Sequence, residues 1–471
     1  MLFHEPFFAL FAFPAFYAMY LLIERRVTAK KWTLILGSIT FYAWGEPLFV
    51  PVVLASAVAD YWLSQRIAAT KAPARRVYLI AGIALNLGIL IFYKYADFIA
   101  ANLNLALIPL SGTALPLLHI ALPIGVSFVV FEKISYLIDC YRGLSKPARS
   151  FSDYSLFVFL FPKLLAGPIL KYHEMERQIA DPLAVQRIDV QDGFLRTARG
   201  MAKKVLIADP LGAYADKVFG ADPMSLSSGS AALGLLCFTL QIYFDFSAYS
   251  DLAIGIARML GFRLKENFDM PYIARSLSEF WQRWHMSLTS WIREYLYIPL
   301  GGNQRGEFRT YLNLWICFLL SGLWHGASWN FVLWGAYNGL FLSLERLFLK
   351  TAMARAGAAV STIYALTVVM LGWAIFRTTS VAHLAGFLSA LFGGASATAP
   401  LNVPADVPLT TAVAIVLSML PATPLWAPLV RAYETKPLLR HAGAIALTAL
   451  WVIACGRTLA VPFKPFIYFR F

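Results

Sequence analysis

The stretch Phe280–Tyr337 reads FWQRWHMSLTSWIREYLYIPLGGNQRGEFRTYLNLWICFLLSGLWHGASWNFVLWGAY and contains two histidines. Its first half is aromatic and basic and contains His285. Its second half is an apolar run with His325 near the end. Because an ionisable side chain inside a membrane span is costly, such a histidine indicates a functional site. A histidine that only hydrogen-bonds a neighbouring helix is the structural alternative, and this stretch by itself leaves both open.

The composition of the chain is that of a membrane protein. Of its 471 residues, 59% are hydrophobic and 14% are charged, whereas about 25% are charged in a soluble protein. Long uncharged runs predict an all-α polytopic membrane protein, since a helix needs about 20 apolar residues to cross the hydrocarbon core. The net charge of +14 is spread over the short loops between these runs. This is the pattern of the positive-inside rule, so we expect membrane lipid and no nucleic acid as a partner.

The apolar runs alternate with basic loops and predict about 12 transmembrane helices plus one or two re-entrant segments. The first run, Phe7–Ile23, is followed by its basic residues and not preceded by them, so we expect a retained span and no cleaved signal. We expect one domain over residues 1–471. It divides into N-terminal spans (1–150), a core that holds both histidines (151–350) and C-terminal spans (351–471).

The run Tyr154–Leu170, YSLFVFLFPKLLAGPIL, contains two prolines and lies between two basic segments. If both flanks are cytoplasmic, the run cannot cross the membrane, and a re-entrant segment is predicted. Irregular backbone at membrane depth occurs only inside protein or against a cavity. An ordinary kinked span is the alternative.

The longest stretch without a span is Phe262–Thr310, which is basic and is expected to face the cytoplasm. Between Ile273 and Tyr295, apolar residues recur every three to four positions. This spacing predicts an amphipathic helix that lies in the membrane interface. His285 falls on the apolar side of that helix.

Polar side chains form a stripe near the second histidine. Ser321, His325 and Ser328 have the spacing i, i+4, i+7, which predicts one inward face of an otherwise apolar helix. Gly322 and Gly326 flank the histidine and allow another backbone or a ligand to approach closely.

A second polar stripe lies in a separate apolar run. Gln241, Asp245 and Tyr249 share one helical face. An intramembrane carboxylate needs a partner or water, and for Asp245 we expect a structural role, bonded to backbone or to a tyrosine.

The four cysteines are far apart and are read as packing residues: Cys140, Cys237, Cys317 and Cys455.

Two histidines that meet inside a membrane are suited to acid–base chemistry. A neutral imidazole takes a proton from a hydroxyl and returns it to a leaving group. The second ring orients substrate or stabilises an oxyanion. A metal site is the alternative, but no third ligand occurs at a suitable spacing, so we expect no metal.

The strings WHMSLTSWIREYLYIPLGGN and SGLWHGASWNFVLWGAYNG closely resemble the membrane-bound O-acyltransferase (MBOAT) family, most of all its bacterial AlgI-like alginate O-acetyltransferase branch. Further strings share the resemblance, which covers nearly the whole chain: FYAWGEP, PIGVSF, FEKISYLIDCYRG, FPKLLAGPI, IYFDFSAYSDLAIG and PFIYFRF. The resemblance implies an MBOAT-like core with an internal tunnel, in a multi-pass protein of the bacterial cytoplasmic (inner) membrane.

The resemblance also implies an activity. Acetyl groups would pass from cytoplasmic acetyl-CoA, with no permanently bound cofactor, to an exported polysaccharide such as alginate. An extracytoplasmic SGNH-type acetyltransferase, or a wider glycan-modification complex, would be the partner. His325, in SGLWHGASW, matches the catalytic histidine of the family, and His285, in FWQRWHMS, matches its second site position. The basic residues Arg283, Arg293 and Arg305 are candidates for the CoA phosphates, although they also fit a role in topology.

The sequence is also compatible with three other functions. The first is transfer of D-alanine from a carrier protein to teichoic acid. The second is a transporter or flippase of a glycan export system, for which internal repeats would be expected and none is evident. The third is a scaffold for such a system, which leaves the two histidines unexplained.

Overall fold

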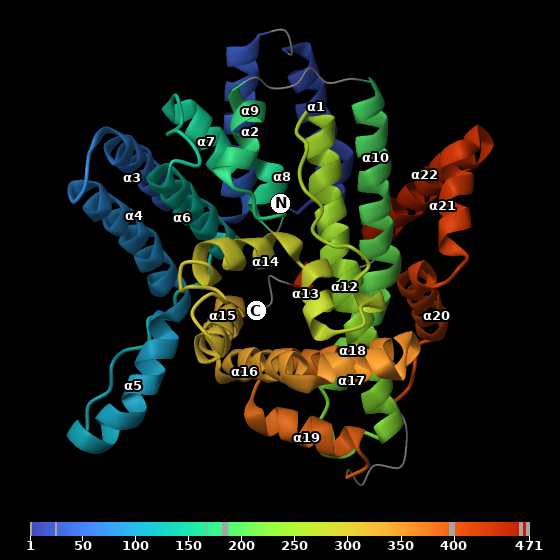
Figure 1. Ribbon diagram of the computed structural model, residues 1–471. Helices are drawn as coiled ribbons and strands as arrows, with labels where there is room; N and C mark the ends of the chain where they lie inside the picture. The colour runs from blue at the N-terminus through green and yellow to red at the C-terminus, as the bar shows by residue number, and fades with distance from the viewer. Residues whose placement is uncertain are drawn as a thin grey trace. The chain divides into compact units, whose positions relative to one another are not determined.

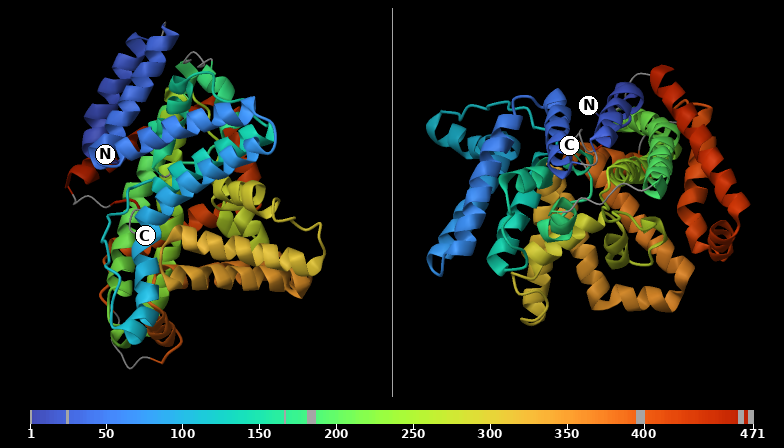
Figure 2. Two further views of the ribbon diagram at one scale, coloured as in Figure 1. Left: turned by 90° about the vertical axis from the view of Figure 1, so that its left-hand side faces the viewer. Right: turned by 90° about the horizontal axis from the view of Figure 1, so that it is seen from above.

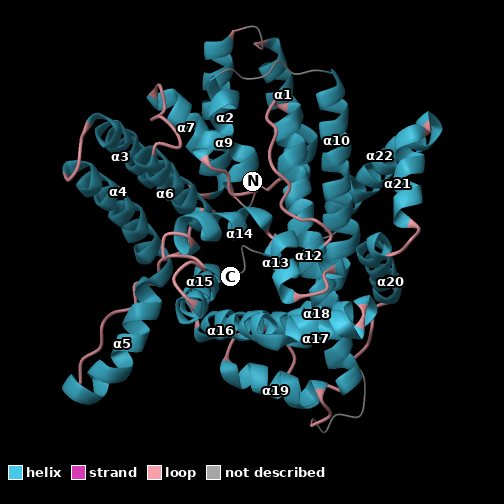
Figure 3. Cartoon of the chain, viewed as in Figure 1, coloured by secondary structure: helices cyan, strands magenta, loops and turns pink. Residues whose placement is uncertain are grey.

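The computed structural model describes residues 2–23, 26–165, 167–180, 187–394, 401–460 and 465–467. Every regular element within these ranges is a helix, and Figures 1 and 3 show only helices and loops there. The predicted all-α class is therefore confirmed. The chain forms two compact units, Met1–Phe194 with Ala253–Lys265, and Leu195–Leu252 with Glu266–Phe471.

The first unit contains the N-terminal helices. These are η1 (Phe8–Ala12), α1 (Phe13–Leu22), α2 (Val27–Gly45), α3 (Val50–Ala69), α4 (Ala74–Leu90), η2 (Ile91–Tyr95), α5 (Ala96–Ser111), α6 (Val126–Arg142), α7 (Phe151–Phe159), α8 (Phe161–Leu164), α9 (Tyr172–Ala180) and the first half of α10 (Arg187–Ala202). Helices α3, α4 and α6 pack against one another, as Figures 1 and 2 show.

Buried polar and charged side chains connect three helices of this group. Lys133 Nζ of α6 lies 3.1 Å from Asp60 Oδ2 of α3, and both side chains are buried. Asn86 of α4 donates to Asp60 Oδ1 at 2.9 Å. Buried charged residues are tolerated when they are paired, so this network accounts for Asp60 and Lys133 within otherwise apolar helices.

The predicted re-entrant run is broken. Helix α7 ends at Phe159, Leu160 leaves the helical region, and α8 has only four residues. Nine residues of α-helix measure about 14 Å, about half of the 30 Å hydrocarbon core. Phe157 through Leu165 are buried in protein. The short, broken, buried geometry agrees with a segment that does not cross, while its depth in a bilayer stays a prediction.

The second unit contains the remaining helices. These are the end of α10, η3 (Lys203–Ala208), α11 (Asp209–Phe219), η4 (Pro223–Ser225), α12 (Ser228–Met259, in part), η5 (Pro271–Ile273), α13 (Leu277–Arg283), α14 (Met286–Ile292), η6 (Arg293–Tyr297), α15 (Glu307–His325), α16 (Trp329–Leu344), η7 (Glu345–Leu349), α17 (Lys350–Ala356), α18 (Ala358–Arg377), α19 (Val381–Leu391), α20 (Asp406–Met419), η8 (Leu420–Ala422), α21 (Trp426–Thr435) and α22 (Pro437–Ala460). Helices α15 and α16 lie side by side in Figures 1 and 2.

Four helical stretches within the described ranges are long and apolar enough to cross a membrane, or five if the bent pair Asp406–Ala422 and Trp426–Thr435 is one span. The four are Ala74–Ser111, Ser228–Met259, Ala358–Arg377 and Pro437–Ala460. Helices such as α2 and α3 have a similar length but contain charged residues. The count of about 12 spans stays a prediction.

The expected amphipathic helix between Ile273 and Tyr295 is not continuous, which corrects the sequence-based expectation. It consists of α13, a break at Trp284 and His285, then α14 and η6. His285 has φ 45° and ψ 52°, the left-handed region, and no α-helix passes through such a residue. The apolar periodicity continues across the break because both short helices bury their apolar residues, Leu277 and Phe280 in α13 and Leu288 and Trp291 in α14.

Candidate active site

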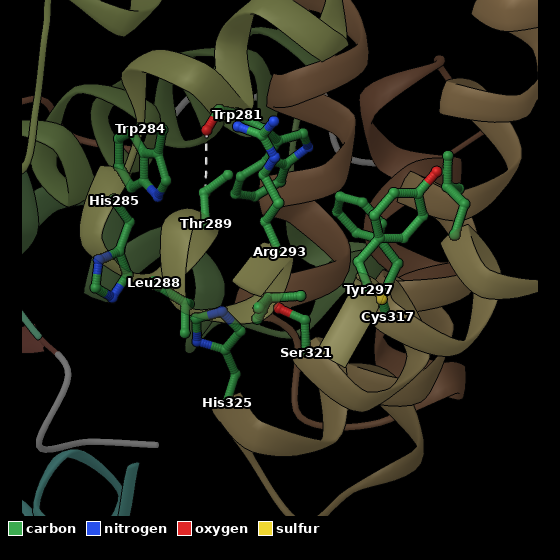
Figure 4. Close-up of a pocket in the computed structure, with 13 residues that line it drawn as sticks. Trp281, Trp284, His285, Leu288, Thr289, Arg293, Tyr297, Cys317, Ser321 and His325 are labelled. Carbon is green, nitrogen blue, oxygen red and sulfur yellow. Dashed lines mark hydrogen bonds between the residues drawn. The ribbon is translucent and has the colours of Figure 1, made fainter. Parts of the chain in front are cut away.

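Both histidines line one cavity of about 180 Å³ in the second unit. Figure 4 shows the two imidazole rings at one end, with Tyr297 and Cys317 at the other. The lining residues are Trp281, Trp284, His285, Leu288, Thr289, Ile292, Arg293, Tyr297, Leu314, Cys317, Phe318, Ser321 and His325. The lining is therefore mostly apolar and aromatic, with a few polar groups, as in sites that bind small ligands.

His325 is the last residue of α15, and Gly326 ends the helix with extended backbone. Its ring lies 5.1 Å from that of Trp334 and 5.2 Å from that of Phe376, both in edge-to-face geometry. These aromatic contacts hold the imidazole in place.

Glycine at 322 allows the two helices that bear this site to approach. A Cβ at Gly322 would lie within 3.0 Å of the Phe331 carbonyl oxygen of α16, and one at Gly326 would overlap the Phe331 ring. The expected close backbone approach is confirmed for Gly322, whereas Gly326 accommodates the Phe331 side chain.

His285 is buried and lies between α13 and α14. Its ring is 4.7 Å from that of Phe246 on α12, edge to face, and its Nδ1 is 3.2 Å from Asn267 Oδ1. Burial lowers the pKa of the His285 imidazole to about 3, so the ring is neutral at physiological pH. A neutral imidazole has one N–H donor and one acceptor nitrogen.

The structure separates the predicted polar stripe. Ser321 lines the cavity together with His325. Ser328 does not share their helical face, because α15 ends at His325 and Ser328 is the N-cap residue of α16. The i, i+4, i+7 spacing holds only within one helix, so the expectation for Ser328 was wrong.

Asp245 and Tyr249 lie on α12 and are absent from the cavity lining. Asp245 forms an ion pair with Lys204 at 2.9 Å and accepts a hydrogen bond from the backbone N–H of Ile467 at 2.8 Å. Tyr249 stacks on Phe466, with ring centroids 4.8 Å apart. Both residues thus hold the C-terminal segment, which agrees with the structural role expected for Asp245.

Of the three candidate arginines, only Arg293 lines the cavity. Arg283 pairs with Glu279 at 2.9 Å and with Asp269 at 3.1 Å outside it. Arg305 is exposed in the loop before α15. The structure therefore favours Arg293 as the cation nearest to a ligand in the cavity.

Sequence reasoning missed Asn267, which contacts His285 from 18 positions upstream. No motif or spacing indicates such a contact. The cavity-lining Trp281, Trp284 and Leu288 were seen only as an apolar stripe.

Within the described ranges, no group of three or more histidine, cysteine or acidic residues has the geometry of a metal site.

The chain is similar to several known proteins. A family model described as "MBOAT, membrane-bound O-acyltransferase family" matches residues 147–382. The chain is 41% identical over 385 residues to a protein of Azotobacter vinelandii named "Probable alginate O-acetylase AlgI". The aligned region covers 81% of this chain and 76% of that protein. A protein of Pseudomonas aeruginosa with the same name is 40% identical, over 81% and 73% of the two chains.

A third relative has a different name. The "Peptidoglycan O-acetyltransferase" of Helicobacter pylori is 36% identical over 380 residues, which is 74% of this chain and 71% of that protein. On this evidence the chain belongs to the membrane-bound O-acyltransferase family. It is therefore a membrane protein and an acyltransferase, as its sequence strings suggested.

Proposed function

We propose that this acyltransferase moves acetyl groups from cytoplasmic acetyl-CoA across the bacterial inner membrane for O-acetylation of an exported, alginate-like polysaccharide. An extracytoplasmic SGNH-type acetyltransferase is the proposed partner. The relatives' names support the reaction class, since an alginate O-acetylase and a peptidoglycan O-acetyltransferase both acetylate a glycan. The alginate proteins share more identity with this chain, which favours an alginate-like polymer.

The observation that carries the proposal is the meeting of His285 and His325 in one largely apolar cavity. The two residues are 40 positions apart and come from different elements of the second unit. If either histidine served packing alone, a second imidazole lining the same cavity would have no explanation. The volume of about 180 Å³ suits the acyl–thioester end of a donor better than a whole CoA molecule.

In the proposed step, His325 acts as general base. It takes the proton of an acceptor hydroxyl, whose oxygen forms a bond to the thioester carbon. The carbon–sulfur bond then breaks, and the CoA thiolate leaves with the proton that His325 returns. His285 provides the second polar contact to the reacting groups. The apolar lining excludes water, which would otherwise hydrolyse the thioester.

The position of Arg293 suggests where the donor enters. Its guanidinium belongs to a basic, aromatic segment and lines the same cavity as the histidines. We propose that it attracts the phosphates of CoA at the cytoplasmic side, because arginine binds phosphate in a charge-assisted manner. A multi-pass arrangement of about 12 spans with an internal tunnel would let the acetyl group leave on the opposite side.

The test uses His325→Ala and His285→Ala in cells that make the polymer, with His441→Ala as a matched control. His441 is an exposed histidine of α22, outside the cavity. We expect His325→Ala to abolish polymer acetylation although the protein accumulates normally in the membrane. The control should acetylate like the wild type. Wild-type acetyl content in His325→Ala would refute its role as base.

The donor is tested separately with membrane vesicles. Labelled acetyl-CoA and a D-alanyl carrier protein are supplied in parallel, and release of CoA or of the carrier thiol is measured. We expect consumption of acetyl-CoA only. Consumption of the D-alanyl thioester would assign the alternative activity, and consumption of neither would favour a transport role.

A further inference from the structure

Asn267 is built into the loop that holds His285. It is completely buried, and its backbone carbonyl accepts a hydrogen bond from Met286 N at 3.0 Å. Its side-chain Oδ1 accepts from Ser287 N at 3.1 Å and from Ser287 Oγ at 2.9 Å, and lies 3.2 Å from His285 Nδ1. One residue therefore contacts three consecutive residues around the histidine.

These contacts determine the orientation of the amide. The backbone N–H of Ser287 can only donate, so the Asn267 atom that faces it must be the carbonyl oxygen. An oxygen at that position also requires His285 Nδ1 to be the donor in its contact with Asn267. In the neutral ring, the lone pair then lies on Nε2, which is a hydrogen-bond acceptor.

The backbone around this contact is strained in a way typical of functional sites. His285 and Met270 both have left-handed conformations, with φ 45° and φ 48°. Such conformations persist in non-glycine residues only where the surroundings over-determine them. Here two backbone hydrogen bonds connect the two segments. Met286 N donates to Asn267 O, and Asp269 N donates to Arg283 O. Arg196 further anchors the neighbouring Glu266.

We infer that Asn267 is a positioning residue that holds His285 with its Nε2 as an acceptor, so that His285 binds an O–H or N–H group of the substrate. This inference rests on the proposed acetyl transfer. It revises one sequence-based expectation, because a neutral His285 in this tautomer has no N–H at Nε2 with which to polarise an acyl carbonyl. Stabilisation of the oxyanion must then come from another donor.

The experiment is a double-mutant cycle of Asn267→Ala and His285→Ala in membrane vesicles. The rate of thiol release is measured against donor concentration, with the thioester that the wild type consumes. If Asn267 acts through His285, Asn267→Ala should lower kcat by about tenfold or more with little change in KM. The double variant should be no slower than His285→Ala alone, because the two losses are then not additive.

Two further variants separate positioning from a general structural role. Asn267→Asp retains an oxygen acceptor and gives up no hydrogen bond of Nδ2 to the described residues, so it should recover most of the lost rate. Asn338→Ala removes another buried asparagine, which among the described residues donates within α16 to Trp334 O at 2.8 Å, and should stay near the wild-type rate. All rates are normalised to the amount of protein in the membrane.

Additive losses in the cycle, or an Asn267→Asp variant as slow as Asn267→Ala, would overturn the inference. Failure of the proposed function has a different signature. If the wild type consumes the D-alanyl thioester and not acetyl-CoA, the donor assignment fails, while the same cycle on that thioester still tests Asn267.

Discussion

Substitution of Gly322 by alanine tests whether the position of His325 depends on the close packing of α15 on α16. Gly322 lies one helical turn before His325. A Cβ built there comes within 3.0 Å of the Phe331 carbonyl oxygen and 3.1 Å from the Phe331 carbonyl carbon. The obstacle is backbone, which cannot rotate away as a side chain can.

The size of the effect follows from this geometry. Ordinary van der Waals contact of a Cβ begins at 3.4 Å, so α15 and α16 must separate locally. A displacement of about 1 Å at a catalytic group lowers the rate by about 100-fold, and overpacking costs about 1–3 kcal/mol of folding free energy. We therefore expect turnover to fall by about two orders of magnitude while most of the protein still folds.

The assay measures thiol release from the donor by vesicles with equal amounts of wild-type and variant protein. Two glycine-to-alanine controls come from the same unit. Gly456→Ala on α22 adds its methyl group where no atom of the described residues outside its own helix backbone lies within 4 Å, and it should have no effect. Gly339→Ala on α16 has the Trp315 side chain as its nearest contact, at 3.3 Å, and should cost less than Gly322→Ala. Wild-type turnover by a normally accumulated Gly322→Ala protein would refute the reasoning.

Two further outcomes are expected. Arg293→Gln should raise the KM for acetyl-CoA by about tenfold with little change in kcat, since a hydrogen bond to a charged group contributes about 1.5–3 kcal/mol. The exposed Arg305→Gln is the control, and an unchanged KM for Arg293→Gln would contradict a role in donor binding. Lys133→Met should reduce accumulation in the membrane, because it leaves the Asp60 carboxylate buried without its cation, at a cost of about 3–5 kcal/mol. Accumulation should recover in the double variant Asp60→Asn/Lys133→Met, and a double variant no better than the single one would count against this explanation.

Local patterns in the chain were enough to predict the class of protein and to single out His285 and His325. Hydropathy is a property of consecutive residues, so the membrane character and the helical class followed directly. His325 and His285 were found because imidazoles are unusual within apolar and aromatic stretches, and because the strings around them resemble a family. The broken run at Leu160 was indicated by its prolines in the same way.

Contacts between distant residues decided the rest. The left-handed backbone at His285 interrupts a helix whose periodicity looked continuous, and the end of α15 at His325 removes Ser328 from the predicted face. Periodicity records which residues are buried, but it does not record where the helix axis changes direction.

The sequence by itself therefore determined the membrane class, the helical class and the choice of His285 and His325 as candidate site residues. Only the tertiary structure decided that these rings share a cavity, that Arg293 and not Arg283 lines it, and that Asn267 sets the tautomer of His285. The physical reason is that hydropathy and motifs are encoded in neighbouring residues. A hydrogen bond between residues 18 positions apart depends instead on how the chain folds back on itself.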